Sequence, residues 1–494
     1  MKKTFVAAMV MAVAILMAAP AMALDFSSDG YFRVRGFYNS HPLLLEEVEP
    51  NANSTLDQDD DSDAWMDQRL RVNSKLTVMK GLDVLTRFRA CNGYWGDGGA
   101  KENVMQWKRV WMSITTPVGL FDVGRMSAFA WGTLFVDSED SADRIKWTLP
   151  LADQFFLIAI FQKNTELDAE YFGVDNANDA DSDTYYLAGV YRSEMLNAGL
   201  LGAYTNHKTE SENQWQPNPL NPGFNLDPQF SADIFAFLPY FKFNMGNFRM
   251  QGELAYKWGS VDFERDNQFA MAQPVNGGIP DYDIDALAWN LEAGFDHSMF
   301  GAEIGYAWVS GDTTQTDDEL SAYGGVGADW CKLYILTDTN NDLYTNLGTT
   351  GNLAGAGNAD TLGQIGADYF DTNWGVNPTY NPGNTGSKIF YLGGYFKPME
   401  SLKLGLIYGN AKAEQTPTIN GVSWSQDYGN EIDFVLEWAM FDNLNYTFIA
   451  AYLDAGDYFA DAAFYNNSVV GAASSADVQL ENNITLAHEL KLTF

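Results

Sequence analysis

The residues from Ile484 to Phe494 read ITLAHELKLTF, a strand pattern that ends on an aromatic residue. Its apolar side chains share one parity: Ile484, Leu486, Leu490, Leu492 and Phe494. Only His488 interrupts that parity with a polar group. Successive side chains of a strand point to opposite faces, so this segment suits a wall with hydrocarbon on one side and water on the other.

The N-terminal segment predicts export. Lys2 and Lys3 precede an apolar run that ends at Ala19, and the small-residue motif Ala21-Met22-Ala23 follows. This order predicts a cleaved signal peptide over 1–23 and a single mature domain over 24–494. No other apolar run approaches the length of a helical membrane span, so the mature chain is either soluble or crosses a membrane as strands. Aromatic residues make up 14% of the chain, which favours strands with aromatic girdles.

Alternating polar and apolar residues recur from residue 30 onward, and short turn sequences separate the alternating segments. Eight tight turns are predicted, at 79–83, 116–119, 149–152, 192–195, 244–247, 296–299, 397–401 and 440–443. Eight hairpins with one strand at each end predict eighteen strands, or sixteen if one weak hairpin fails. Longer polar segments alternate with the tight turns, and the longest is 310–386.

A single alternating strand would fit a soluble β-sandwich equally well. Eighteen strands of about ten residues, with their loops, account for the mature length, whereas a compact soluble chain of that length would divide into several domains. The prediction is an all-β, transmembrane, antiparallel up-and-down barrel with short periplasmic turns and long external loops. An even strand number places both termini in the periplasm.

Basic residues concentrate between residues 30 and 150, where several recur at a spacing of two. They are predicted to line one arc of an aqueous lumen: Arg33, Arg35, Arg69, Arg71, Lys75, Arg87, Arg89, Arg109, Arg125, Arg144 and Lys146. Acidic residues of later strands are predicted to line the opposite wall: Glu292, Asp296, Glu431, Asp433 and Glu437. Opposed arcs would set up a field across the lumen. Alternatively, these inward charges are simply solvated.

The segment GLFDVGRM (119–126), with the aromatic, glycine-containing loop that follows it, resembles a strand and loop of the general bacterial porins. In that family the third long loop folds into the barrel. The resemblance implies an inward-folded loop near 127–141 and places Arg125 beside a constriction. It also implies a set of constriction acids: Asp137, Glu139, Asp140 and Asp143.

The stretch YGNEIDFVLEW (428–438), continuing through 442–446 to 454–459, resembles the major trimeric porins of sulfate- and metal-reducing bacteria. That resemblance implies a homotrimer surrounded by outer-membrane lipid and lipopolysaccharide, which admits small hydrophilic solutes passively. A weaker likeness to alginate-export barrels exists in the same region. The loop 310–386 belongs to neither pattern.

The chain carries 29 basic and 65 acidic residues, a net charge of −36 that argues against binding nucleic acid. An acidic mouth and a basic lumen arc predict opposite ion preferences. Surface charge is screened within about 10 Å at 0.1 M salt. We expect a weak cation preference that fades as salt rises.

Two further features concern the predicted external loops. Asp338, Asn340 and Asp342 show the D-x-N-x-D spacing of oxygen ligands for calcium, although a plain solvated acidic loop would carry the same residues. No other cofactor is expected. Cys91 and Cys331 either form one disulfide that pins the longest loop over the barrel or remain separate thiols.

The sequence gives little support to catalysis. The four histidines are scattered, and the G-x-S-x-G, H-E-x-x-H and C-x-x-C-H motifs are missing. Two functions remain in view. The first is a passive diffusion porin, and the second is a scaffold barrel that sheathes an electron-conduit cytochrome or acts as a surface adhesion protein.

Overall fold

The computed structural model describes residues 25–40, 44, 62–96, 105–128, 130–137, 140–166, 181–209, 230–263, 281–312, 319–323, 329–337, 385–416, 418–419, 422–465, 475 and 478–494. The first strands of its wall are β1 (Asp25–Ser40), β2 (Ser62–Met79), β3 (Leu82–Tyr94), β4 (Gln106–Thr116), β5 (Gly119–Ala128), β6 (Asp140–Ala152), β7 (Phe155–Thr165), β8 (Ser182–Arg192) and β9 (Leu196–Thr209). The wall continues through β10 (Phe230–Met245), β11 (Phe248–Phe263), β12 (Tyr282–Asp296), β13 (Phe300–Val309), β15 (Ser387–Met399), β16 (Leu402–Lys412), β19 (Asp427–Phe441), β20 (Leu444–Ala455) and β21 (Asn483–Thr493).

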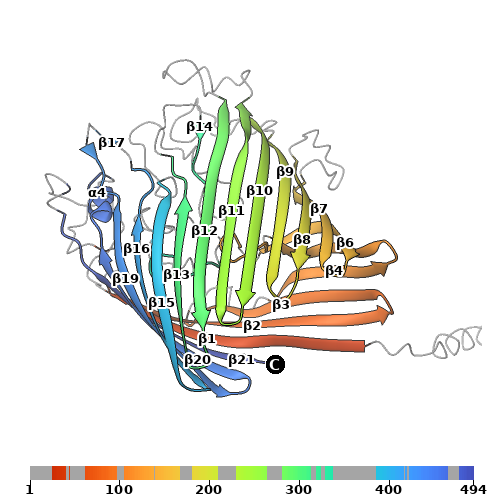
Figure 1. The fold of residues 1–494 in the computed structure, drawn as a ribbon, viewed down its shortest axis with the longest axis horizontal. Helices are drawn as coiled ribbons and strands as arrows, with labels where there is room; N and C mark the ends of the chain where they lie inside the picture. The colour runs from red at the N-terminus through yellow and green to blue at the C-terminus, as the bar shows by residue number, and fades with distance from the viewer. Residues whose placement is uncertain are drawn as a thin grey trace, which may run out of the picture.

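The wall closes on itself because β1 pairs with both β2 and β21. Each wall strand pairs antiparallel with the next, and Figure 1 shows them following one another around the barrel. Within the described residues the closed wall has eighteen strands, which confirms the predicted fold class and strand number. Smaller elements are β14 (Glu319–Leu320), which pairs parallel with β12, the pair β17 (Thr418–Ile419) and β18 (Val422–Ser423), and α4 (Tyr458–Tyr465).

Eight connections in the wall are only two or three residues long: 80–81, 117–118, 153–154, 193–195, 246–247, 297–299, 400–401 and 442–443. Seven coincide with the turns expected from the sequence. The turn expected at 149–152 lies slightly later, because β6 continues through a register shift between Pro150 and Ala152. Proline cannot donate a ladder hydrogen bond and is tolerated at such irregularities.

The two faces of the wall differ in polarity, as the alternation predicts. In β19, Ile432 and Trp438 are 47% and 44% exposed on the outer face, whereas Glu431 and Asp433 on the inner face are 0% and 2% exposed. Paired strands repeat this parity, so the outer surface carries exposed apolar side chains such as Leu187, Ile304 and Leu406. Among the described residues, none of the helices has the length and apolar character needed to cross a bilayer.

A hydrophobic core occupies part of the inside of the barrel. It joins inward residues of the later strands to residues from the connections, with Phe135, Trp330, Leu333, Tyr391, Tyr428 and Tyr458 among its large members. One side of the interior is therefore packed with the chain's own loop residues. The side formed by the first strands carries the arginines described next.

Candidate functional site

The basic residues of the first strands face one another across the sheet. Arg33 lies opposite Arg69 in the β1–β2 register, Arg71 lies opposite Arg89, and Arg87 lies opposite Arg109. Directly opposed residues of an antiparallel pair point to the same face, so these six side chains share the inner face. Like charges at this distance repel, and such a row is stable only where water and neutral partners solvate it. We call the inward basic residues of β1–β4 and β6 the basic arc.

Several arginines of the basic arc donate to neutral acceptors. Arg69 Nε donates to Asn92 Oδ1 at 2.5 Å, Arg87 Nε to Asn73 Oδ1 at 2.7 Å, and Arg89 Nη2 to Gln106 Oε1 at 2.9 Å. Arg109 donates to Ser141 Oγ and to the backbone oxygen of Asp140, each at 3.0 Å. Arg144 Nε donates to Gln162 Oε1 at 2.5 Å. These bonds orient the guanidinium groups without cancelling their charge.

Three members of the arc do contact carboxylates. Arg35 forms a two-pronged ion pair with Asp67, Arg33 lies 3.7 Å from Glu489, and Lys75 lies 2.9 Å from Asp83. Arg71 stacks on the ring of Tyr31, and Lys146 lies opposite Asp122 in the register. The neutralised part of the arc is thus mainly at Arg35 and Lys75. Arg69 and Arg89 have neutral acceptors and present positive charge to the lumen.

Arg125 does not join this arc, which corrects its place among the predicted lumen-lining basic residues, and neither Arg125 nor Asp143 takes the constriction role that the family resemblance implied. Arg125 lies opposite Val110 and Asp143, on the exposed outer face with Val110 and Ile145. The two side chains form an ion pair of 2.9 Å and are 50% and 58% exposed. The motif that suggested Arg125 does not fix which face the side chain takes, whereas the pairing register does.

The segment 130–137, between β5 and β6, crosses to the wall formed by β10 and β11. Trp131 Nε1 donates to the backbone oxygen of Leu238 at 2.9 Å, and the backbone N–H of Thr133 donates to Glu253 Oε2 at 2.8 Å. Gly132 has a φ of +65°, and a Cβ there would lie 2.6 Å from Glu253 Oε1, so the close approach requires glycine. The segment is therefore fixed to the far wall of the barrel.

The four acids assigned to this loop separate in the structure. Asp137 ends the crossing segment, and its backbone oxygen accepts from the backbone N–H of Asp329 at 3.1 Å. Asp140 is exposed at the start of β6. Glu139 lies outside the described residues, and Asp143 lies on the outer face as stated above.

A second segment, 329–337, also lies inside the barrel and is held by two buried acids of β19. The backbone N–H groups of Ile335 and Leu336 donate to Glu431 at 2.6 and 2.8 Å, and that of Tyr334 donates to Asp433 at 2.9 Å. Buried backbone N–H groups need acceptors, and the carboxyl oxygens of these two side chains supply them. We call this set of three bonds the carboxylate latch.

Ion pairs hold the same segment from the other side. Lys332 Nζ lies 2.5 Å from Glu292 and 3.5 Å from Glu303. Arg249 pairs with Glu292 as well, and it lies 2.8 Å from Asp296 and 2.7 Å from Glu303. Glu437 pairs with Lys403 at 3.0 Å. Each predicted acid of the opposite wall therefore contacts a cation or a backbone amide, and none of these partners was predicted from the sequence.

The two inward segments meet each other. The rings of Phe135 and Trp330 lie 5.5 Å apart at an interplanar angle of 81°, and Trp330 also packs against Tyr391. Together with the hydrogen bond between Asp329 and Asp137, these contacts join the segments into one body. That body stands against the wall from β10 to β19 and leaves the basic arc on the other side.

Neither Cys91 nor Cys331 forms a disulfide, so the structure contradicts the disulfide alternative. Cys331 is exposed within the segment 329–337, beside Trp330 and Lys332. Asp338, Asn340 and Asp342 lie outside the described residues. Among the residues that are described, no group of three potential ligands is placed to hold a metal ion.

The segment 329–337 and its anchors were missed from the sequence. A signal for it exists, because Trp330, Leu333, Tyr334, Ile335 and Leu336 form an apolar cluster within a long polar connection. Apolar residues at that density need a place to be buried. The acceptors on β19 carry no such signal, since a backbone amide from any residue would suit them.

Comparisons with known proteins complete the description. No family model and no curated protein matches the chain. Solved structures similar to it include OmpT of Vibrio cholerae in its trimer form, with 13% identity, 95% of this chain and 99% of that chain covered, and a TM-score of 0.41. OccK8 (OprE) of Pseudomonas aeruginosa has 13% identity, coverage of 95% and 98%, and a TM-score of 0.45. The anion-selective porin from Comamonas acidovorans has 11% identity, coverage of 95% and 100%, and a TM-score of 0.41.

Proposed function

We propose that this chain is an outer-membrane channel through which small hydrophilic solutes diffuse passively. The observation that carries the proposal is the two-sided closed wall. Its outer face exposes apolar side chains around the barrel, whereas its inner face carries arginines, lysines and carboxylates. A closed barrel leaves no unpaired strand edge in hydrocarbon, and a charged interior requires water. Such a wall fits a protein that is surrounded by the lipid and lipopolysaccharide of an outer membrane.

The constriction of this channel is proposed to lie between the basic arc and the body formed by the segments 130–137 and 329–337. Glu431 and Asp433 are buried beneath the segment 329–337, and the other acids of the far wall pair with Arg249, Lys332 or Lys403, so these acids are shielded from a passing ion. Arg69 and Arg89 of the arc donate to neutral side chains and keep their positive charge. We therefore propose an anion preference, in place of the weak cation preference expected from overall charge, because charge at a constriction acts at contact distance.

Purified, refolded protein in planar bilayers tests this function. We expect discrete conductance steps, and a zero-current potential across a KCl gradient whose sign corresponds to chloride permeating faster than potassium. A folded barrel that conducts no ions would exclude the proposal. Conduction with a preference for potassium would agree with a channel but would contradict the role assigned to the basic arc.

The orientation and assembly are part of the same proposal. Gly30 and Phe494 exchange backbone hydrogen bonds of 2.9 and 3.1 Å, which places the end of β21 beside β1 at the edge that carries the short turns. We assign that edge to the periplasm and propose a homotrimer of the kind found among the porins named from the sequence. The scaffold alternative is disfavoured, because the chain's own segments already occupy the interior where a sheathed partner would stand.

Cys331 gives a direct test of where the segment 329–337 lies. A charged methanethiosulfonate reagent added to open channels should lower the conductance by at least about a third, since the exposed thiol stands beside the solute path. Cys331→Ser should be insensitive, and Cys91→Ser should respond as the wild type does, because Cys91 is only half exposed and lies on β3. Equal sensitivity of wild type and Cys331→Ser would place the segment away from the path.

A further inference from the structure

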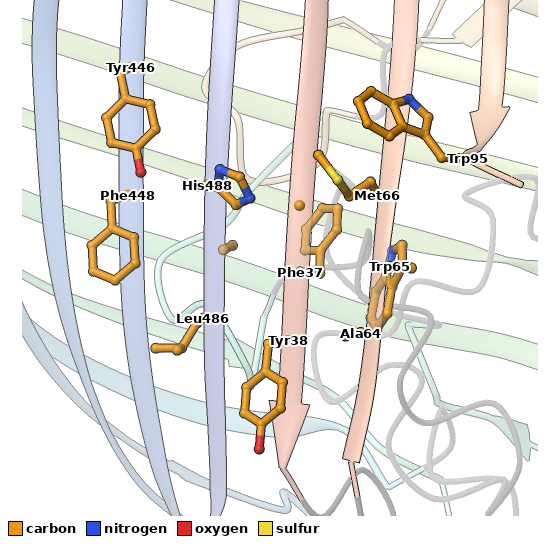
Figure 2. Close-up of a pocket in the computed structure, with 12 residues that line it drawn as sticks. Phe37, Tyr38, Ala64, Trp65, Met66, Trp95, Tyr446, Phe448, Leu486 and His488 are labelled. Atoms are coloured by element: carbon orange, nitrogen blue, oxygen red, sulfur yellow. The ribbon is translucent and has the colours of Figure 1, made fainter.

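A hollow of about 670 Å³ opens in the wall where β20, β21, β1 and β2 lie side by side, as Figure 2 shows. In the register Gly36 lies opposite Met66 and His488, and Tyr38 lies opposite Ala64 and Leu486. These residues have the same parity as Phe32 and Leu490, which are exposed on the outer face. The hollow therefore opens outward, away from the lumen. We call it the seam notch, with Gly36, Tyr38, Ala64, Tyr446, Phe448 and His488 as its defining residues.

Small residues create the notch, and a histidine lies across it. A Cβ on Gly36 would fall 2.1 Å from Nε2 of His488, so the imidazole rests directly on the backbone of β1. Ala64 leaves further space on β2, and the Phe448 and Tyr446 rings stand on the other side (Figure 2). Any larger residue at position 36 would displace the imidazole. The wall is thus hollowed at the one place where its outer face carries a histidine among the apolar residues of β21.

The position of His488 along β21 puts it deep in the apolar band. It stands six residues before Phe494, whose neighbour Thr493 bonds to the turn residue Asn443 at the edge of the wall. Six residues span about 20 Å of strand, or about 15 Å along the membrane normal at a tilt of about 40°. The hydrocarbon core of a bilayer is about 30 Å thick, so the imidazole lies near its midplane. Polar side chains at that depth are costly and are kept where they serve a role.

Three polar groups of the notch have no hydrogen-bond partner within the described part of the chain: the imidazole of His488 and the phenol hydroxyls of Tyr38 and Tyr446. The contact of His488 is the ring of Tyr446, with centroids 6.4 Å apart. Acyl chains offer neither donors nor acceptors, and lipid headgroups lie about half a bilayer away. An imidazole and a phenol can satisfy each other, so a surface that offers both chemistries at one depth is self-complementary.

We propose that the seam notch is the docking surface for a second copy of this chain. A closed symmetric oligomer brings the same patch of each copy to its axis, where His488 of one copy can bond a notch tyrosine of the other while aromatic side chains fill the hollow. This inference rests on the proposed membrane location. The sequence resemblance implies an oligomer but does not say which surface forms the contact. The present inference assigns that contact to the seam notch and to His488.

Native mass spectrometry of the full chain in a mild detergent tests the assignment, because it reports both the number of copies and any bound lipid. Ala64→Trp should fill the hollow, and His488→Phe should keep a flat ring while removing both nitrogens. We expect an oligomer for the wild type, and a dissociation constant raised at least tenfold by each variant. Ala293→Trp is the matched control: Ala293 is exposed on the outer face of β12, opposite Met250 and Ile304, and this variant should assemble as the wild type does.

The outcomes separate the alternatives. A monomeric wild type, or an Ala64→Trp variant that assembles fully, would overturn the proposal. A monomer that carries lipid, which Ala64→Trp then loses, would assign the notch to lipid instead and also overturn it. Heat-modifiable migration checks that each variant is folded, and His488→Phe keeps the test decisive if Ala64→Trp does not fold. Conductance is measured in parallel, and dissociated variants that still conduct separate this inference from the channel function.

Discussion

Replacing Glu431 by alanine should raise the single-channel conductance at least about twofold. The carboxylate latch gives Ile335 and Leu336 their backbone acceptors, and Glu431 is 0% exposed beneath them. A hydrogen bond contributes about 0.5–1.5 kcal/mol and a buried amide left without an acceptor costs about 1–3 kcal/mol, so the loss of both acceptors removes several kcal/mol of attachment. The segment 329–337 would then leave the wall for much of the time, and the cross-section open to ions would grow.

The control for this variant stands on the same strand. Glu437 has the inward parity of Glu431 on β19, but it pairs with Lys403 rather than with the segment, so Glu437→Ala should leave the conductance within about a fifth of the wild-type value. Faster reaction of Cys331 with thiol reagents should accompany the rise in Glu431→Ala. A conductance equal to that of the wild type, with unchanged thiol reactivity, would show that the remaining contacts of Lys332 and Trp330 hold the segment alone.

Exchanging three arginines of the basic arc for glutamine should reverse the ion preference. Arg69, Arg71 and Arg89 form a cluster on β2 and β3, held by Asn92, the ring of Tyr31 and Gln106. Removing three positive charges from one constriction should lower the ratio of chloride to potassium permeability about tenfold. The measurement is the zero-current potential in a KCl gradient, at low and at high mean concentration.

Arg125→Gln supplies the matched control for that triple variant. It makes the same chemical change on β5, but Arg125 lies on the outer face and pairs with Asp143, so the permeability ratio should stay at the wild-type value. Because the Debye length is about 3 Å at 1 M salt, an effect of distant surface charge would vanish there, whereas contact with the arc would persist. A shift in Arg125→Gln as large as that of the triple variant would refute the placement of the basic arc.

The wall could be predicted from the sequence because its determinants are local. Alternation of period two sets the faces of Ile432 and Glu431, and the two- or three-residue turns set which strands are neighbours. The same alternation carried the correct position of Arg125, which shares its parity with Val123 on the outer face. The predicted basic arc and the family motif both placed Arg125 in the lumen, and strict alternation was the better guide there.

The contents of the barrel could not be predicted in the same way. The latch joins Glu431 to backbone amides of Ile335 and Leu336, and no side-chain pattern marks a backbone donor. Likewise Glu253 is bonded by Thr133 from a segment far away in the chain. These contacts depend on how a long connection packs after the wall has closed, so the acids could be placed on the inner face but their partners could not.

The pairing of β1 with β21 also has a consequence for how the molecule is made. The ladder that closes the barrel joins two very distant parts of the polypeptide, as the hydrogen bond from Thr485 to Asn39 across 446 residues illustrates. Contacts of such long range form slowly. Until they form, the first and the last strand each expose an unpaired backbone edge that can pair with another chain. Biogenesis therefore depends on protecting these two strand edges until they pair with each other.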